Sequence, residues 1–289
     1  MGPKNRLPIL RAWFPRVGTR KALKLVLIFL TSVNSSCGGN LFESMSNKES
    51  HDAIIQDVEK LVNELRFSDA VELIEANSDL TVTDRRELML FASAYAGLCG
   101  LTFAEVFDSL ETAGGSPMFF MMNAFRTRIV NPARCFTAQQ WIQRIGTVAN
   151  RTSTENIAMF LIGFAKVGTY LRNRADTSAA GIGDGTVDPT FDSCDNTDLP
   201  RDEVKQIITG FGLMIENIAA LGTNLSAGMT ADINNLNAAC TLLGLNCTTT
   251  NPTAVTDADA DEFRDAIKSD SATQIGIENC DPASPLCCP

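Results

Sequence analysis

The stretch that decides the fold is LMLFASAYAGLCGLTFAEVF, residues 88–107. Large and small apolar side chains recur in it at helical spacing, at Leu88, Phe91, Ala92, Tyr95 and Ala104. Small residues let two antiparallel helices approach closely, while large ones fill the gap to the next pair of helices. Gly100 interrupts the run, so we expect one helix to end there and a second to follow it.

The same pattern recurs when the chain is shifted by 34 residues. The shift aligns Ile54 with Leu88 and Leu61 with Tyr95. Thirty-four residues is the period of the tetratricopeptide repeat, a helix–turn–helix unit. Residues 51–150 therefore resemble that family, although later positions of the second helix carry acidic residues instead of apolar and small ones. A generic bundle of helical hairpins with the same spacing is the alternative, and it gives the same fold class.

Helical signals continue beyond the repeat, and no alternating strand pattern occurs in residues 47–175. Ser46 with Glu49 and Thr152 with Glu155 have the spacing of capping boxes, which begin helices. We predict an all-α helical hairpin array or bundle over residues 46–245, with an acidic Gly/Asp/Thr loop at 176–199 and a cysteine-containing tail at 246–289. The expected helices span residues 51–66, 83–98, 102–110, 118–130, 137–150, 154–175, 200–221, 229–243 and 257–268.

The first 36 residues have the pattern of an export signal. Residues 1–24 are basic, and residues 25–33 form an apolar run that is shorter than the roughly 20 residues needed to span a bilayer. Small residues then lead to Cys37, so the segment resembles the lipobox of bacterial lipoproteins, with Asn34 at the position where leucine is usual.

The lipoprotein resemblance has consequences for the mature chain. It implies cleavage before Cys37, acylation of that cysteine, and a tether over residues 37–45. It also favours the outer membrane, because Gly38 is not the aspartate that retains such proteins at the inner membrane. A plain secreted protein and an uncleaved anchor are the alternatives.

Nine cysteines occur, and an acylated Cys37 leaves an even number, as expected for four disulfides in an exported protein. Loop closure favours Cys240 with Cys247, followed by Cys280 with Cys287 or Cys288. Cys99 and Cys135 each lie near the end of a predicted helical segment and could staple neighbouring hairpins. No CxxC pair occurs, so a thiol metal site is not expected. The disulfide candidates are Cys99, Cys135, Cys194, Cys240, Cys247, Cys280, Cys287 and Cys288.

Composition argues against several functions. His51 is the only histidine, which excludes multi-histidine metal sites and HExxH proteases. No phosphate-binding glycine loop and no catalytic grouping appear, so an enzyme is not expected. Residues 1–36 carry seven Lys/Arg and no acid, leaving 17 of the 24 basic residues to set against 34 acidic ones. A body this acidic repels phosphate backbones, so we expect no nucleic-acid partner.

Two sites are candidates for ligands. The aspartates Asp184, Asp188 and Asp192 lie in a glycine-containing loop whose centre is similar to a calcium loop, so a weak calcium site is possible; a solvated loop is the alternative, and no other cofactor is expected. Soft Met and aromatic side chains could instead line an adaptable groove for a ligand or partner, with a buried helix as the alternative. The groove candidates are Met118, Met121, Met122, Phe125 and Tyr95.

These patterns together predict a lipid-anchored periplasmic or outer-membrane scaffold whose helices bind a protein partner. The alternative is a small-molecule-binding accessory lipoprotein of a transport system, with its ligand held between helices beside the Met/Phe run. The wider resemblance is to helical lipoproteins of the bacterial periplasm.

Overall fold

The structure, a computed structural model, describes residues 50–102, 116–177, 181–219, 241, 246–268 and 275–277. This part of the chain contains eight α-helices, two short 3-10 helices and no strand, which confirms the all-α class. The elements are α2 (His51–Asn63), α3 (Phe67–Ala76), α4 (Arg85–Cys99), α6 (Pro117–Asn123), α7 (Pro132–Gln143), η1 (Val148–Asn150), α8 (Ser153–Ala175), α9 (Arg201–Asn217), η3 (Pro252–Ala254) and α11 (Asp257–Lys268).

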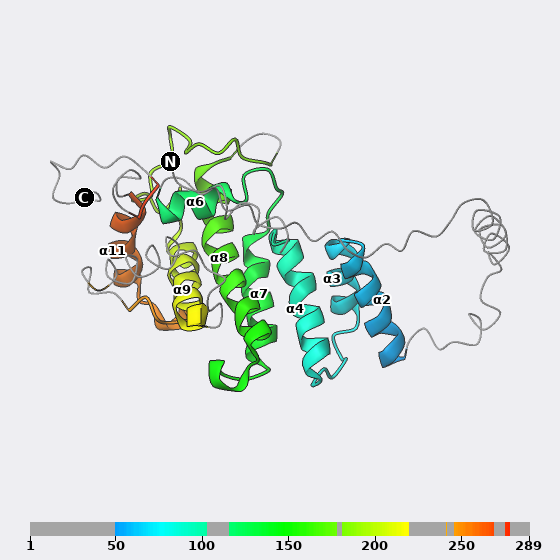
Figure 1. The fold of residues 1–289 in the computed structure, drawn as a ribbon. Coiled ribbons are helices and arrows are strands. Elements are labelled where there is room, and N and C mark those ends of the chain that lie inside the picture. Colours follow the sequence, from blue (N-terminus) through cyan, green and yellow to red (C-terminus); the bar gives the residue numbers. More distant parts are fainter. Residues whose placement is uncertain are drawn as a thin grey trace, which may run out of the picture. The chain divides into compact units, whose positions relative to one another are not determined.

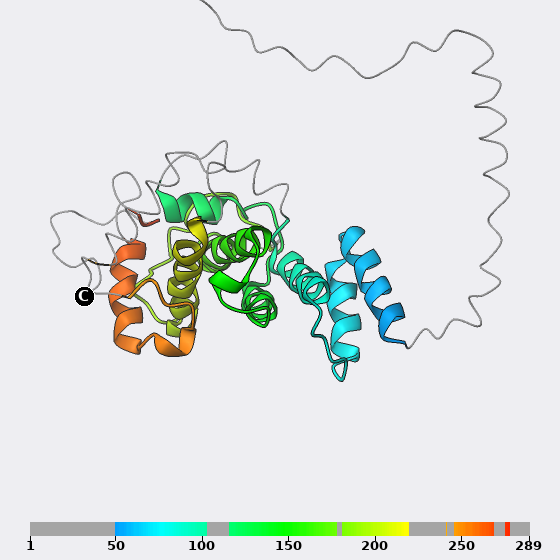
Figure 2. The same cartoon turned by 60° about the horizontal axis from the view of Figure 1, so that its bottom comes forward.

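The long helices lie side by side in the order of the chain. Helices α2, α3 and α4 pack on one another, α4 packs on α7, α7 on α8, α8 on α9, and α9 on α11 (Figure 1). The short helix α6 packs on α8. The same succession is visible in the turned view, with α2 and α3 beside α4 and α11 beside α9 (Figure 2). One apolar core therefore runs between successive helices along the described chain.

Helix α8 is the centre of this arrangement. Eighteen of its 23 residues are buried, as expected for a helix that is apolar on nearly all sides. It begins with the predicted capping box, in which Thr152 and Glu155 satisfy each other's backbone N–H groups. The predicted helix 154–175 is thus confirmed within one residue.

Helices α8 and α9 approach each other closely at two glycines, Gly163 and Gly210. A Cβ atom on Gly163 would lie 2.6 Å from the carbonyl oxygen of Gly210, and one on Gly210 would lie 2.9 Å from that of Gly163. Real Cβ atoms essentially never come this close to a backbone oxygen, so any side chain at either position would push the helices apart.

Three predicted helix boundaries between residues 118 and 150 are wrong. The predicted helix 118–130 ends at Asn123 and continues as tight turns, in which the N–H of Arg126 donates to the carbonyl oxygen of Asn123. The carbonyl oxygen of Arg126 also accepts a hydrogen bond from the N–H of Gly183 at 2.6 Å. Pro132, expected only to stop a helix, begins α7 instead. Proline is favourable in the first turn, since its missing N–H has no partner there anyway. Helix α7 then ends at Gln143.

The 34-residue period matches the start of two helices. His51 begins α2 and Arg85 begins α4, and these two helices pack on each other. The partner helix expected at 102–110 lies outside the described residues, except for Thr102, which is not helical. A further shift by 34 residues finds no helix that matches α2 and α4, since α6 ends at Asn123. The signal segment, the tether and the helix expected at 229–243 also lie outside the described residues, apart from Thr241.

The turn between α2 and α3 holds a leucine in an unusual conformation. Leu65 has φ of 58°, the left-handed region, and its side chain is 66% exposed. Its N–H donates to the carbonyl oxygen of Val62, and the N–H of Arg66 donates to that of Leu61. This is the Schellman pair of hydrogen bonds that ends a helix, and glycine is usual at the position of Leu65 because it has no Cβ to clash.

The substitution Leu65→Gly should raise the free energy of unfolding by about 1 kcal/mol, because the left-handed conformation costs a leucine roughly that much. Urea unfolding followed by circular dichroism measures the change. As a control, Lys60→Gly places glycine in the exposed interior of the same helix and should lower stability by about 1 kcal/mol. A loss of stability in both variants would contradict the strain assigned to Leu65.

Candidate functional site

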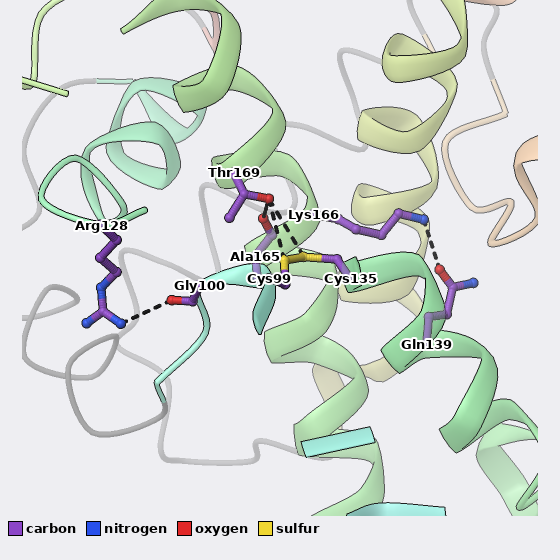
Figure 3. The surroundings of a disulfide bond; sticks show 8 residues. All are labelled: Cys99, Gly100, Arg128, Cys135, Gln139, Ala165, Lys166 and Thr169. Carbon is purple, nitrogen blue, oxygen red and sulfur yellow. Dashed lines mark hydrogen bonds between the residues drawn. A yellow bond between two sulfur atoms is a disulfide. The ribbon is translucent and has the colours of Figure 1, made fainter. Parts of the chain in front are cut away.

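A disulfide between α4 and α7 marks the most polar part of the interior. Cys99 is the last residue of α4 and Cys135 lies in the first turn of α7; their Cα atoms are 5.2 Å apart and both side chains are buried. Each sulfur lies 3.7 Å from the hydroxyl oxygen of Thr169 in α8 (Figure 3). That hydroxyl donates to the carbonyl oxygen of Ala165. The disulfide bond therefore links α4 to α7 beside α8, as the positions of the two cysteines near helix ends suggested.

The remaining cysteines are described in part. Cys194 and Cys247 also form disulfide bonds. The predicted pairing of Cys247 with Cys240 stays a prediction, because Cys240 lies outside the described residues. The other cysteines outside the described residues are Cys37, Cys280, Cys287 and Cys288.

Replacing both Cys99 and Cys135 by alanine should lower the free energy of unfolding by about 4 kcal/mol. The bond joins residues 36 positions apart, and a cross-link of that span restricts the unfolded chain by about this amount. Urea unfolding without reductant measures the loss. Thr169→Val keeps the disulfide and removes only the neighbouring hydroxyl, so it should cost about 1 kcal/mol. A double variant no less stable than Thr169→Val would contradict a stabilising cross-link.

A buried lysine lies one helical turn from Thr169. The side chain of Lys166 is fully buried, and its Nζ donates hydrogen bonds to Gln139 Oε1 in α7 at 2.9 Å and to Thr209 Oγ1 in α9 at 2.8 Å (Figure 3 shows the first). The ring of Phe136 lies 5.2 Å from Nζ. One amine therefore connects three successive helices at the centre of the fold.

The hydrogen bonds around Lys166 have a fixed direction. Gln139 Nε2 donates to the carbonyl oxygen of Thr250 at 2.8 Å, so the amide oxygen of Gln139 faces the lysine. The hydroxyl of Thr209 donates to the carbonyl oxygen of Gln206, which leaves its oxygen free to accept from Nζ. A neutral amine has two N–H groups, and both find an acceptor here. An ammonium has three, and within the described chain the third finds none.

Burial sets the charge of this amine. Removal from water lowers the pKa of Lys166 to about 7, because the charged form loses its hydration and no carboxylate nearby restores it. Near neutral pH the amine is therefore divided between its charged and neutral forms, and it is mostly uncharged only above that pH. Sequence analysis missed Lys166, although the signal was available: it is a lone basic residue inside an apolar run, Phe164–Gly168.

The three aspartates predicted as calcium ligands are occupied by protein donors. Asp184 accepts from the N–H and hydroxyl of Thr186, and Asp188 accepts from the N–H and hydroxyl of Thr177. Asp192 accepts from Lys268 Nζ at 2.8 Å, which holds the pKa of its carboxyl below the usual range. Within the described ranges, no group of three or more His, Cys, Asp or Glu side chains is placed to hold a metal ion, so the calcium site is not confirmed.

The acidic loop is instead hydrogen-bonded to α11 through backbone carbonyl groups. The buried guanidinium of Arg264 donates to the carbonyl oxygens of Ser193 and Leu199, each at 2.6 Å. Arg201 in α9 forms a bidentate salt bridge with Asp261 in α11. Sequence analysis overlooked Arg264, which lies among the apolar positions of the predicted helix 257–268.

The five groove candidates are buried. The exposed fractions of Met118, Met121, Met122, Phe125 and Tyr95 lie between 0% and 4%. Gly168 lets α6 lie directly on α8, because a Cβ atom there would overlap the carbonyl oxygen of Met121 and the ring of Phe125. Tyr95 packs in α4 with the guanidinium of Arg134 over its ring. The structure therefore corrects the groove interpretation: these side chains form core, not an open surface.

Comparison with known proteins does not assign this site: no protein-family model, no curated protein and no solved structure matches the chain. Among the helices that the structure describes, none is both long and apolar enough to cross a membrane.

Proposed function

We propose that this protein is an exported, lipid-anchored helical scaffold that binds a protein partner on the surface of its N-terminal helices. The observation that carries the proposal is the serial packing of helices α2 to α11 around one core. The interior polar groups described above form contacts within the fold, at the disulfide, at Lys166 and at Arg264. Function is then assigned to the outer surface, as in other arrays of stacked helices.

Two features support a tetratricopeptide-like arrangement for this surface. The starts of α2 and α4 are separated by the period of that repeat, and both helices pack on α3 as well as on each other. The turn after α2 is short, as a helix–turn–helix unit requires. Helix α2 keeps polar residues on its outer side, and Asp52, Gln56 and Lys60 are exposed.

Export and anchoring are proposed from the N-terminal residues and from the cysteines. A buried disulfide between α4 and α7 is typical of proteins that fold in an oxidising compartment. The lipobox-like segment places Cys37 as the first mature residue, about a dozen residues before α2 begins. Acylation there would tether the helical array to a bacterial membrane, with the outer membrane favoured by Gly38.

Cys37→Ser should abolish membrane association, since the hydroxyl cannot form the thioether to the lipid. Fractionation of cells that express the full chain, together with the intact mass of the extracted protein, measures the effect. Cys194→Ser serves as a control because it removes a cysteine but leaves the anchor, and it should remain with the membrane. If Cys37→Ser still sediments with membranes, the anchor assignment is wrong.

The partner surface is testable by position. A photo-crosslinking amino acid at Gln56 in α2 or Glu72 in α3 should give one discrete protein adduct in intact cells. The same group at Glu262, exposed on α11, should give none. Failure to form an adduct at both N-terminal positions would contradict the scaffold. Native mass spectrometry of the membrane-extracted protein provides the second arm: a bound small molecule would favour the transport-accessory alternative instead.

A further inference from the structure

We propose that an acid-sensitive hydrogen-bond link from Lys166 through Gln139, here called the clasp, holds residues 246–255, here called the strap, against α7 and α9. Protonation of the Lys166 amine weakens this link and favours release of the strap. The strap is an irregular segment with a single 3-10 turn, η3, that packs on α9. Its link to the lysine runs through Gln139, whose amide accepts from Nζ on one side and donates to the carbonyl oxygen of Thr250 on the other. The state of the amine and the position of the strap are therefore coupled by one side chain.

The strap lies very close to α9 at one point. A Cβ atom on Gly212 would overlap the carbonyl group of Thr249, so the backbone of the strap sits directly on the helix backbone. Cys247 and Val255 are buried at its two ends, while most residues between them are at least partly exposed. The strap thus lies on α9 and hydrogen-bonds to α7 through a part-exposed stretch of backbone, whereas the helices themselves are held by the apolar core.

Within the part of the chain that the structure describes, no charged group of the elements packed around Lys166 balances a charge on its amine. Burial is the sole influence on its pKa, the strap contains no acidic or basic side chain, and α6 contains none either. The charged residues of α4, α7, α8 and α9 are engaged elsewhere, in the pairs Arg85–Glu155, Arg86–Glu59, His51–Glu87, Arg134–Glu75, Arg174–Glu203, Lys205–Asp257, Arg201–Asp261 and Arg151–Glu216. Arg144 donates to the carbonyl oxygen of Val82, and Arg172 to that of Gly181.

Protonation therefore favours an open clasp. Below neutral pH the amine gains a third N–H, for which the described residues provide no acceptor in the closed state. The Phe136 ring, 5.2 Å from Nζ, offsets only part of the cost of burying the charge. Opening the strap lets water reach Nζ, and the exposed amine has its ordinary pKa, about 10.4. Between that value and about 7 the open form binds a proton that the closed form does not. The closed form is thus favoured as pH rises through this window, and its advantage is smallest below it.

Amide hydrogen exchange of the full chain tests the clasp. Between pH 8 and pH 6, after correction for intrinsic exchange, opening of the strap should increase about tenfold, which is the change expected for a closed-state pKa near 7 and an open-state pKa near 10.4. The change should be confined to peptides that cover residues 248–256. In Lys166→Met, which removes the titrating group, it should vanish, and in the control Lys60→Met, an exposed lysine of α2, it should persist.

Three results would overturn the proposal. These are equal strap protection at pH 6 and pH 8 in the unsubstituted chain, a tenfold change that survives in Lys166→Met, and a change of the same size throughout α8 and α9. A measurement on the unsubstituted chain guards against a variant that fails to fold. The ¹³Cε chemical shift of Lys166 should titrate with a midpoint near 7, and a midpoint near 10 would equally refute the clasp.

Discussion

Between Ala158 and Arg172, helix α8 is buried against α4, α6, α7 and α9, so polar side chains in this part of the helix have no free face from which to reach water. Each position along it must therefore fit a particular neighbour. Gly163 admits α9, Gly168 admits α6, and Thr169 lies beneath the disulfide. A polar group in this helix must find its hydrogen-bond partners inside the protein, because an unsatisfied one would cost several times the energy of a typical net hydrogen bond. The network around Lys166 follows from that requirement.

Local signals in the sequence were sufficient at several helix ends that are determined by their own neighbours along the chain, although the end of α2 and the start of α7 were misplaced. Asp84 caps α4, Gly100 ends it in the left-handed conformation, and Thr152 with Glu155 begins α8. The bounds of α11 were predicted without error. Each of these ends is fixed by hydrogen bonds that span only a few residues, so the sequence pattern carries the necessary information.

Features that depend on distant residues were missed or misassigned. The turns after α6 contact the distant Gly183, and the Met/Phe run lies against α8 at Gly168, where a side chain would overlap it. Lys166 and Arg264 occupy apolar faces, where periodicity alone does not reveal which carbonyl or amide will accept from them. The hydrogen-bond partners of the loop aspartates, Thr177 and Lys268 among them, could not be read from the sequence, because they become neighbours only after folding.

The anchorage of the acidic loop has a consequence for the order in which the chain acquires its structure. Arg264 is separated from its acceptors Ser193 and Leu199 by 71 and 65 residues, so the loop is synthesised long before the side chain that fastens it. Helices α2 to α4 can pair with close neighbours as soon as they emerge, whereas the C-terminal half matures only when translation or translocation is almost complete. A chain interrupted before α11 would retain its early hairpins and leave those two carbonyls unsatisfied, a target for the quality control of the cell.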